Sequence, residues 1–188
     1  MITAYLESTG ILGPAEIEQV LPFHRERTLK KNDLFVREGE YCREVAFVNS
    51  GIFRSFYTSD EGEEITYCFR FPGEFVTAYS AFITGEPSLE NMQAISAATL
   101  TVIRKEDLDR LSAANPAWLR LMKTMAEQEF IGLEKRVFQL QRMQAAERYR
   151  MLLEYQPEYV QNIPLQYLAS YLGISQRHLS RIRKDLVF

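Results

Sequence analysis

Twenty residues near the end of the chain, Leu165 to Lys184, restrict the possible folds more than any other stretch of the sequence. Two segments with helical spacing meet there at Gly173, a residue that accepts the positive φ of a tight turn. Ala169, four positions earlier, is small enough to let two helices cross closely. Ser175 is a favourable N-cap for the second segment. This spacing predicts a helix-turn-helix.

Five further positions of such a motif must be apolar, because they form the contact between its two helices. These positions hold Leu168, Leu172, Ile174, Leu179 and Ile182. The alternative is a plain helical hairpin whose polar face is only solvated. The second segment argues against that alternative, since it carries Arg177, Arg181 and Lys184 with no acid before Asp185. A helix that enters the major groove needs donors and positive charge.

The second helix therefore carries the predicted contacts to DNA. They are Ser175, Gln176, Arg177, His178, Ser180, Arg181 and Lys184. We expect Gln176, Arg177 and Arg181 to lie nearest the base edges. His178 and Lys184 are expected to meet phosphates. Arg181 is assigned to a specific base, because arginine to guanine is the commonest specific contact.

The charge of the chain is unevenly distributed. The net charge is −3, yet the segment from Gln161 to Phe188 holds four basic residues and one acid. That segment therefore has a charge of +3 and the remainder a charge of −6. A mildly acidic body with a basic tip can bind an anionic polymer locally.

Residues from about 28 to 103 are expected to form strands. The run Ile65–Arg70 alternates apolar and polar residues, as a half-buried strand does. Glycines occupy positions 39, 51, 62, 73 and 85. This spacing of 11 or 12 residues predicts successive hairpins in an all-β roll or barrel. A short helix from about Pro14 to Leu21 is predicted before the strands, with proline in its first turn.

Asn115 and Pro116 predict the start of a long helix, with asparagine as the N-cap. Seven apolar residues then follow at helical spacing: Leu119, Met122, Ala126, Phe130, Leu133, Val137 and Leu140. Trp118, Leu121 and Met125 widen this stripe at its N-terminal end. The stripe could pack against its own domain. A helix of about 25 residues leaves apolar surface uncovered, however, so we predict that the stripe pairs with its copy in a homodimer. Short helices follow it, interrupted before Pro157 and Pro164.

Composition argues against several classes of function. The chain has two histidines, His24 and His178, so a His-rich metal site cannot be assembled. Cys42 and Cys68 are too few for an iron–sulfur cluster and are interpreted as reduced cytoplasmic thiols. Nucleophile-elbow and Walker motifs are absent from the sequence. We therefore expect a cytoplasmic protein that is no enzyme and holds no metal or cofactor. The sequence contains neither a signal peptide nor an apolar run of about 18 residues, so we expect no membrane partner.

The chain resembles the CRP/FNR family of transcription regulators over nearly its whole length. The resemblance rests on Arg37–Glu40, Phe47–Gly51, Phe71–Glu74, the long helix and Leu179–Lys184. The runs Arg148–Leu153 and Ile163–Gly173 are similar to the Bacteroidetes-type branch. The family resemblance implies an α+β fold with an N-terminal cyclic-nucleotide-binding-like β-roll of jelly-roll type, a dimerisation helix and a C-terminal helix-turn-helix.

The resemblance also implies domains and partners. The roll, an effector domain, would cover residues 1–114, the dimerisation helix 115–143 and the DNA-binding domain 144–188. Such proteins are homodimers that bind two-fold symmetric double-stranded DNA, with half-sites ~34 Å apart. RNA polymerase and an unidentified small-molecule effector are further candidate partners. Many members continue after the helix-turn-helix into a β-hairpin wing. Because the sequence ends at Phe188, we expect the affinity for DNA to rest on the second helix of the motif.

The predicted effector pocket consists of Gly73, Glu74, Ser88 and Leu89. In nucleotide-binding members an arginine followed by a hydroxyl residue clamps the cyclic phosphate, and Ser88 and Leu89 take those places here. Losing a charge-assisted bidentate contact costs about 2–5 kcal/mol, so we expect that cyclic AMP is not a physiological ligand. Glu74 either keeps a ribose contact or is structural after a tight turn. The alternative function is an effector-gated regulator that binds a cyclic nucleotide or another small molecule in the roll. An enzyme of the jelly-roll type is a third, disfavoured class.

Overall fold

The computed structural model describes residues 1–186 of the chain. Two compact units are present. The first comprises Met1–Tyr57 and Cys68–Ala126, and the second comprises Thr58–Tyr67 and the segment from Glu127 onward. Val187 and Phe188, where the predicted DNA-binding domain ends, lie outside the described residues. The predicted boundaries at 114 and 143 stay predictions.

Two short helices precede the strands. They are α1 (Ile2–Ser8) and α2 (Pro14–Val20), and α2 is followed by the 3-10 turn η1 (Leu21–Phe23). The predicted helix from Pro14 is confirmed, whereas α1 has no counterpart in the sequence-based expectations. The side chain of Glu16 accepts a hydrogen bond from the Gly13 amide at 3.0 Å, which satisfies one of the amides left unpaired at the start of α2.

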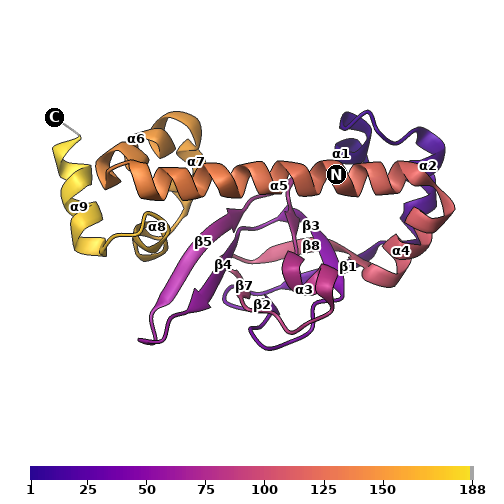
Figure 1. Cartoon of the computed structure of the whole chain (residues 1–188), viewed down its shortest axis with the longest axis horizontal. Coiled ribbons are helices and arrows are strands. Elements are labelled where there is room, and N and C mark those ends of the chain that lie inside the picture. The colour runs from indigo at the N-terminus through magenta and orange to yellow at the C-terminus, as the bar shows by residue number, and fades with distance from the viewer. Residues whose placement is uncertain (187–188) are drawn as a thin grey trace. The chain divides into compact units, whose positions relative to one another are not determined.

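The strands form two four-stranded sheets (Figure 1). The first has the order β1 (Arg25–Leu29), β8 (Ala98–Arg104), β3 (Glu44–Ser50), β6 (Phe75–Val76). The second has the order β2 (Leu34–Val36), β7 (Asn91–Ala94), β4 (Phe53–Thr58), β5 (Glu64–Arg70). β8 pairs antiparallel with both β1 and β3, and β7 pairs antiparallel with β2 and β4. The expected β-roll is confirmed.

The glycine spacing marks turns, but the expectation of successive hairpins is wrong. Gly51 joins β3 to β4, which lie in different sheets, and Gly85 ends helix α3 (Tyr79–Thr84) in a left-handed conformation. Only Gly62, of the five, lies between neighbouring strands of one sheet, β4 and β5. Gly51 has φ of 90°, and a Cβ there would lie 2.5 Å from the Ala98 Cβ. The crossing between sheets therefore requires glycine at this position.

Apolar residues of both sheets share one core. Phe47, Val48, Phe53 and Leu100 are at most 1% exposed. Helix α4 (Lys105–Ala114) follows the strands and leads into α5 (Pro116–Arg142). The start of α5 is confirmed, because the Asn115 Oδ1 accepts a hydrogen bond from the Ala117 amide at 2.9 Å.

Four helices follow α5 within the described residues: α6 (Ala145–Tyr155), α7 (Pro157–Asn162), α8 (Leu165–Tyr171) and α9 (Gln176–Asp185). The predicted breaks before Pro157 and Pro164 are confirmed, since α7 begins at Pro157 and Pro164 precedes α8. The predicted α+β fold with a roll, a long helix and C-terminal helices is therefore present. Across residues 1–186, no helix combines the length and the apolar character that a membrane crossing needs.

Candidate nucleic-acid interface and effector site

Helices α8 and α9 have the packing of a helix-turn-helix (Figure 1). The apolar contact residues are at most 6% exposed, with Ile174 half-buried; they are Leu168, Leu172, Leu179 and Ile182. Ala169 is 2% exposed at the helix crossing. Gly173 has φ of 68°, as the turn requires. The Ser175 hydroxyl accepts a hydrogen bond from the His178 amide at 3.2 Å, which makes Ser175 the N-cap of α9.

The solvent-facing side of α9 is basic. Leu179 and Ile182 face inward, and the opposite side holds Arg177, Ser180, Arg181 and Lys184. At 3.6 residues per turn these four lie within a sector of about 100°. Arg177, Arg181 and Lys184 are exposed, whereas His178 and Ser180 are half-buried. Gln176 is exposed in the first turn, where the N-terminal residues of a recognition helix reach the base edges.

Two arginines that the sequence analysis overlooked hold the end of α8. Arg136 of α5 donates to the Tyr171 carbonyl, and its guanidinium lies 3.7 Å from the centre of the Tyr171 ring. Arg148 of α6 donates from Nη2 to the Leu172 carbonyl at 2.7 Å. These are carbonyls that the end of a helix leaves without an intrahelical partner. Arg148 lies in one of the runs that carry the family resemblance, but no local sequence pattern identifies the partner of either arginine.

The predicted dimer residues lie along one side of α5. Leu119, Phe130, Leu133, Val137 and Leu140 are 42–66% exposed, and Met122 and Ala126 are half-buried. The seven lie within about 80° of the helix circumference. The expectation that Trp118, Leu121 and Met125 widen the stripe is wrong: Trp118 and Leu121 belong to the core of the roll and are 2% and 3% exposed, and Met125 is partly buried against that core. α5 therefore has two apolar faces, one packed and one exposed.

The pair Gly73 and Glu74 forms the turn between β5 and β6. The Glu74 carboxylate accepts a hydrogen bond from the Phe71 amide at 2.6 Å. The Glu74 carbonyl accepts from the Val48 amide, and the Gly73 amide donates to the Val48 carbonyl, each at 2.9 Å. These contacts fit the structural interpretation of Glu74, in which the side chain stabilises its own turn.

The pair Ser88 and Leu89 lies in a loop against Gly39 and Glu40. The Ser88 side chain is 2% exposed, and its hydroxyl donates to the Glu90 carbonyl at 2.8 Å. Its backbone bonds Gly39 and Glu40. Leu89 is 82% exposed. The two halves of the predicted effector pocket thus make contacts with different parts of the roll.

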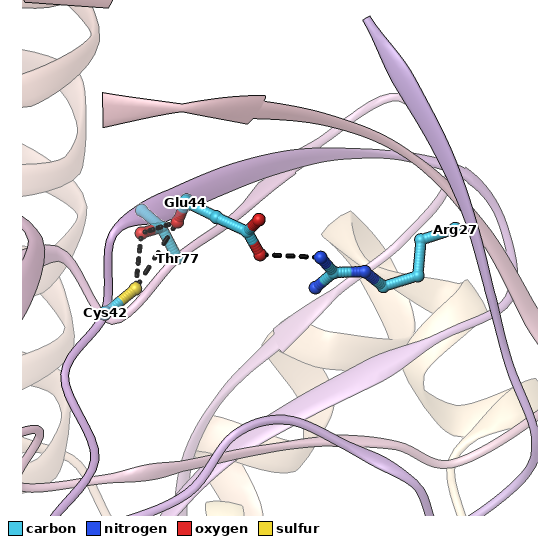
Figure 2. A network of polar contacts seen from close by, with 4 residues as sticks. All are labelled: Arg27, Cys42, Glu44 and Thr77. Atoms are coloured by element: carbon cyan, nitrogen blue, oxygen red, sulfur yellow. Dashed lines mark hydrogen bonds and ion pairs between the residues drawn. The ribbon is translucent and has the colours of Figure 1, made fainter. Parts of the chain in front are cut away.

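A separate cavity of about 580 Å³ lies in the first unit. Residues around it include Cys42, Glu44, Phe82, Gly85, Lys105 and Asp109. Figure 2 shows the polar contacts of two of these residues, Cys42 and Glu44: the Cys42 Sγ lies 3.3 Å from the Thr77 Oγ1, which donates to the Glu44 carbonyl at 2.9 Å. The Glu44 carboxylate pairs with Arg27 at 2.8 Å. The lining holds three basic and three acidic side chains, so its formal charge is balanced. Among residues 1–186, no group of His, Cys, Asp and Glu side chains could hold a metal ion.

Comparisons with known proteins agree with this architecture. A family model for the cyclic nucleotide-binding domain matches residues 26–115. The transcriptional activator protein Anr of Pseudomonas protegens is 26% identical over 162 residues, 86% of this chain and 63% of that protein. The transcriptional activator protein FnrA of Stutzerimonas stutzeri is 31% identical over 129 residues, 69% of this chain and 52% of that protein. The chain thus spans between half and two thirds of the length of these relatives.

Solved structures share the fold at low sequence identity. FixK2 from Bradyrhizobium japonicum has a TM-score of 0.76 and 20% identity, and the match covers 87% of this chain and 84% of that one. CLP of Xanthomonas campestris, a c-di-GMP-responsive global regulator, has a TM-score of 0.74 and 20% identity, with 93% and 91% covered. At this identity the likeness concerns the fold.

Proposed function

The chain belongs to the CRP/FNR family of transcription regulators, and on that premise we propose that it is a homodimeric regulator that binds specific DNA sequences through α9. The observation that carries the proposal is the basic side of α9, with Arg177, Arg181 and Lys184 exposed on a packed helix-turn-helix. Arginine and lysine supply the donors and charge that base edges and phosphates require. Such a protein acts in the cytoplasm, where bacterial DNA lies.

The exposed stripe of α5 supports a homodimer. Phe130 and Leu133 are 66% and 51% exposed on one side of a 27-residue helix. A second copy of α5 would remove these side chains from water, at about 25 cal/mol for each Å² of apolar surface buried. A two-fold axis along the paired helices would present two copies of α9 to the two half-sites of a symmetric operator.

The loop at Ser88 and Leu89 supports a regulator that does not respond to cyclic AMP. Neither residue can supply the cation that clamps a cyclic phosphate, and Leu89 points into solvent. The Ser88 hydroxyl is already bonded within its own loop. Without a charge-assisted contact to phosphate, the affinity for cyclic AMP is expected to fall by about 30-fold or more.

In-vitro selection of DNA sites by the purified protein, with and without cyclic nucleotides, tests these points together. We expect enrichment of one two-fold symmetric sequence, the same in both arms. A pool that stays random would refute specific DNA binding, and enrichment only with cyclic AMP would refute the lack of response. Titration calorimetry with cyclic AMP is the direct check, and micromolar binding would contradict the proposal.

A second candidate function is an effector-gated regulator, and the cavity beside Cys42 favours it. Its volume of about 580 Å³ suits a small metabolite. Lys105 pairs with Asp109 at 3.2 Å, and Arg104 pairs with Glu106 at 3.4 Å. Because the formal charges of the lining are balanced and four of the six are paired within it, a neutral or zwitterionic molecule fits better than a phosphate. Thermal-shift screening of such metabolites would identify a ligand, and loss of the shift in Phe82→Ala would assign it to this cavity.

A further inference from the structure

The hairpin tip between β4 and β5 belongs to the same compact unit as the helix-turn-helix. Ser170 of α8 makes the contact between the helix-turn-helix and this hairpin. Its hydroxyl accepts a hydrogen bond from the Thr66 amide at 2.8 Å and donates to the Glu64 carbonyl at 3.0 Å. β5 is an edge strand of its sheet, and one hydroxyl satisfies both a donor and an acceptor of that edge.

One of the two bonds is shielded from water and the other is exposed. Thr66 is 2% exposed and Ser170 is half-buried, so water does not easily replace the bond from the Thr66 amide, whereas the bond to the Glu64 carbonyl is exposed. The helix-turn-helix has other supports, because Arg136 and Arg148 hold the carbonyls of Tyr171 and Leu172. The Ser170 hydroxyl can therefore be removed while these two bonds to the end of α8 remain.

The docked segment is strongly acidic. Residues 58–67 contain four acids, Asp60, Glu61, Glu63 and Glu64, and no basic residue. All four are exposed. The helix expected to meet the DNA phosphates lies in the same unit. Four carboxylates on a small unit that approaches a polyanion oppose binding, and because the screening length at physiological salt is about 8 Å, this repulsion should weaken as salt rises.

Resting on the proposed function, we propose that residues 58–67 are an autoinhibitory hairpin, which Ser170 holds against the DNA-binding unit and whose charge lowers affinity for DNA. Release of the hairpin from α8 raises the affinity. Since β4 and β5 continue directly into the roll, any event that shifts these strands would change the docking. The hairpin thus offers a route by which the roll controls DNA binding without a change in α9 itself.

The first test removes the two hydrogen bonds by which Ser170 holds the hairpin against α8. Ser170→Ala should bind the selected operator about three- to tenfold more tightly than wild type at low salt. Hydrogen exchange at the Thr66 amide should become faster, because that amide loses its acceptor. Ser80→Ala, an exposed serine of α3, is the matched control and should change neither quantity. Operator affinity that is unchanged or weaker in Ser170→Ala would overturn the inference.

The second test keeps the Ser170 hydrogen bonds and removes negative charge from the hairpin. The triple variant Asp60→Asn, Glu61→Gln, Glu63→Gln should bind more tightly, with a gain that shrinks as salt rises. Its control, Glu7→Gln, Glu18→Gln, Glu26→Gln, changes the net charge equally at exposed positions of the first unit. Equal gains in both triples would overturn the role of the hairpin. Wild-type protein that selects no DNA would refute the proposed function itself, whereas variants that bind no tighter refute only this inference.

Discussion

The Arg148 guanidinium donates from Nη2 to the Leu172 carbonyl at 2.7 Å, one residue before the positive-φ Gly173. Its Nη1 bonds the Met143 carbonyl, at the junction of α5 and α6. One side chain thus joins the start of α6 to the end of α8. Burial lowers the pKa of Arg148, because desolvation disfavours the charged form, yet a guanidinium stays protonated in proteins.

Arg148→Met should destabilise the helix-turn-helix. It removes two charge-assisted hydrogen bonds and leaves two carbonyls without that donor, which is expected to cost about 1–3 kcal/mol. Urea unfolding followed by circular dichroism measures the loss. Arg150→Met, at an exposed position of the same helix, is the control and should stay within about 0.5 kcal/mol of wild type. Equal losses in the two variants would contradict a supporting role for Arg148.

Gly173→Ala should also destabilise the chain, by about 1–2 kcal/mol, because φ of 68° is unfavourable for a residue with a Cβ. Gly132→Ala provides the opposite case. Gly132 lies inside α5 with open space where an alanine Cβ would lie, so alanine should stabilise the helix by up to about 1 kcal/mol. Thermal unfolding of both variants tests the pair, and stabilisation by Gly173→Ala would rule out the strained turn.

Arg181→Ala and Lys184→Ala should affect DNA binding differently. Loss of Arg181 should cost about 1–3 kcal/mol on the selected operator and remove selectivity at one base pair. Loss of Lys184 should weaken all sequences alike and reduce the salt slope by about one. Binding of each variant to the operator and to random DNA distinguishes the two roles. If each variant lost the same affinity on both kinds of DNA, the assignment would fail.

Leu133→Glu or Val137→Glu should yield monomers, because a charge on the stripe cannot be buried without a partner. Sedimentation velocity measures the change. Gln128→Glu introduces the same charge on another side of α5 and should leave the dimer intact. A sedimentation coefficient that does not change in either stripe variant would argue against this interface.

His24 should make stability depend on pH. Burial lowers the pKa of His24 below its ordinary value of 6.5, and the charge of the N-terminus lowers it further. The folded state thus binds a proton less readily than the unfolded state. Stability from this residue is full above pH 6.5 and falls as the pH drops through the lowered pKa. Melting temperatures between about pH 7.5 and 5.5 should decline less in His24→Gln, and parallel curves would exclude His24 as the cause.

Local sequence patterns predicted most of the helix-turn-helix. Gly173 and Ser175 have the backbone roles expected of them, and the spacing of Leu168 and Leu179 matches their burial. Turn chemistry and helical periodicity act over a few residues, so they can be recognised without a partner. The start of α5 at Pro116 follows from the same kind of local signal.

Contacts between distant residues were decided by the tertiary structure. The helical period groups Trp118 with Leu133, but packing buries the first in the roll and leaves the second exposed. Glycine spacing marked the turn at Gly51 without showing that the chain crosses there to the other sheet. The Ser170 hydroxyl meets an amide 104 residues away in sequence. The sequence by itself determined where the chain turns and which elements form, because those choices depend on neighbouring residues. Which faces meet depends on the packing of the whole chain, and only the tertiary structure settles it.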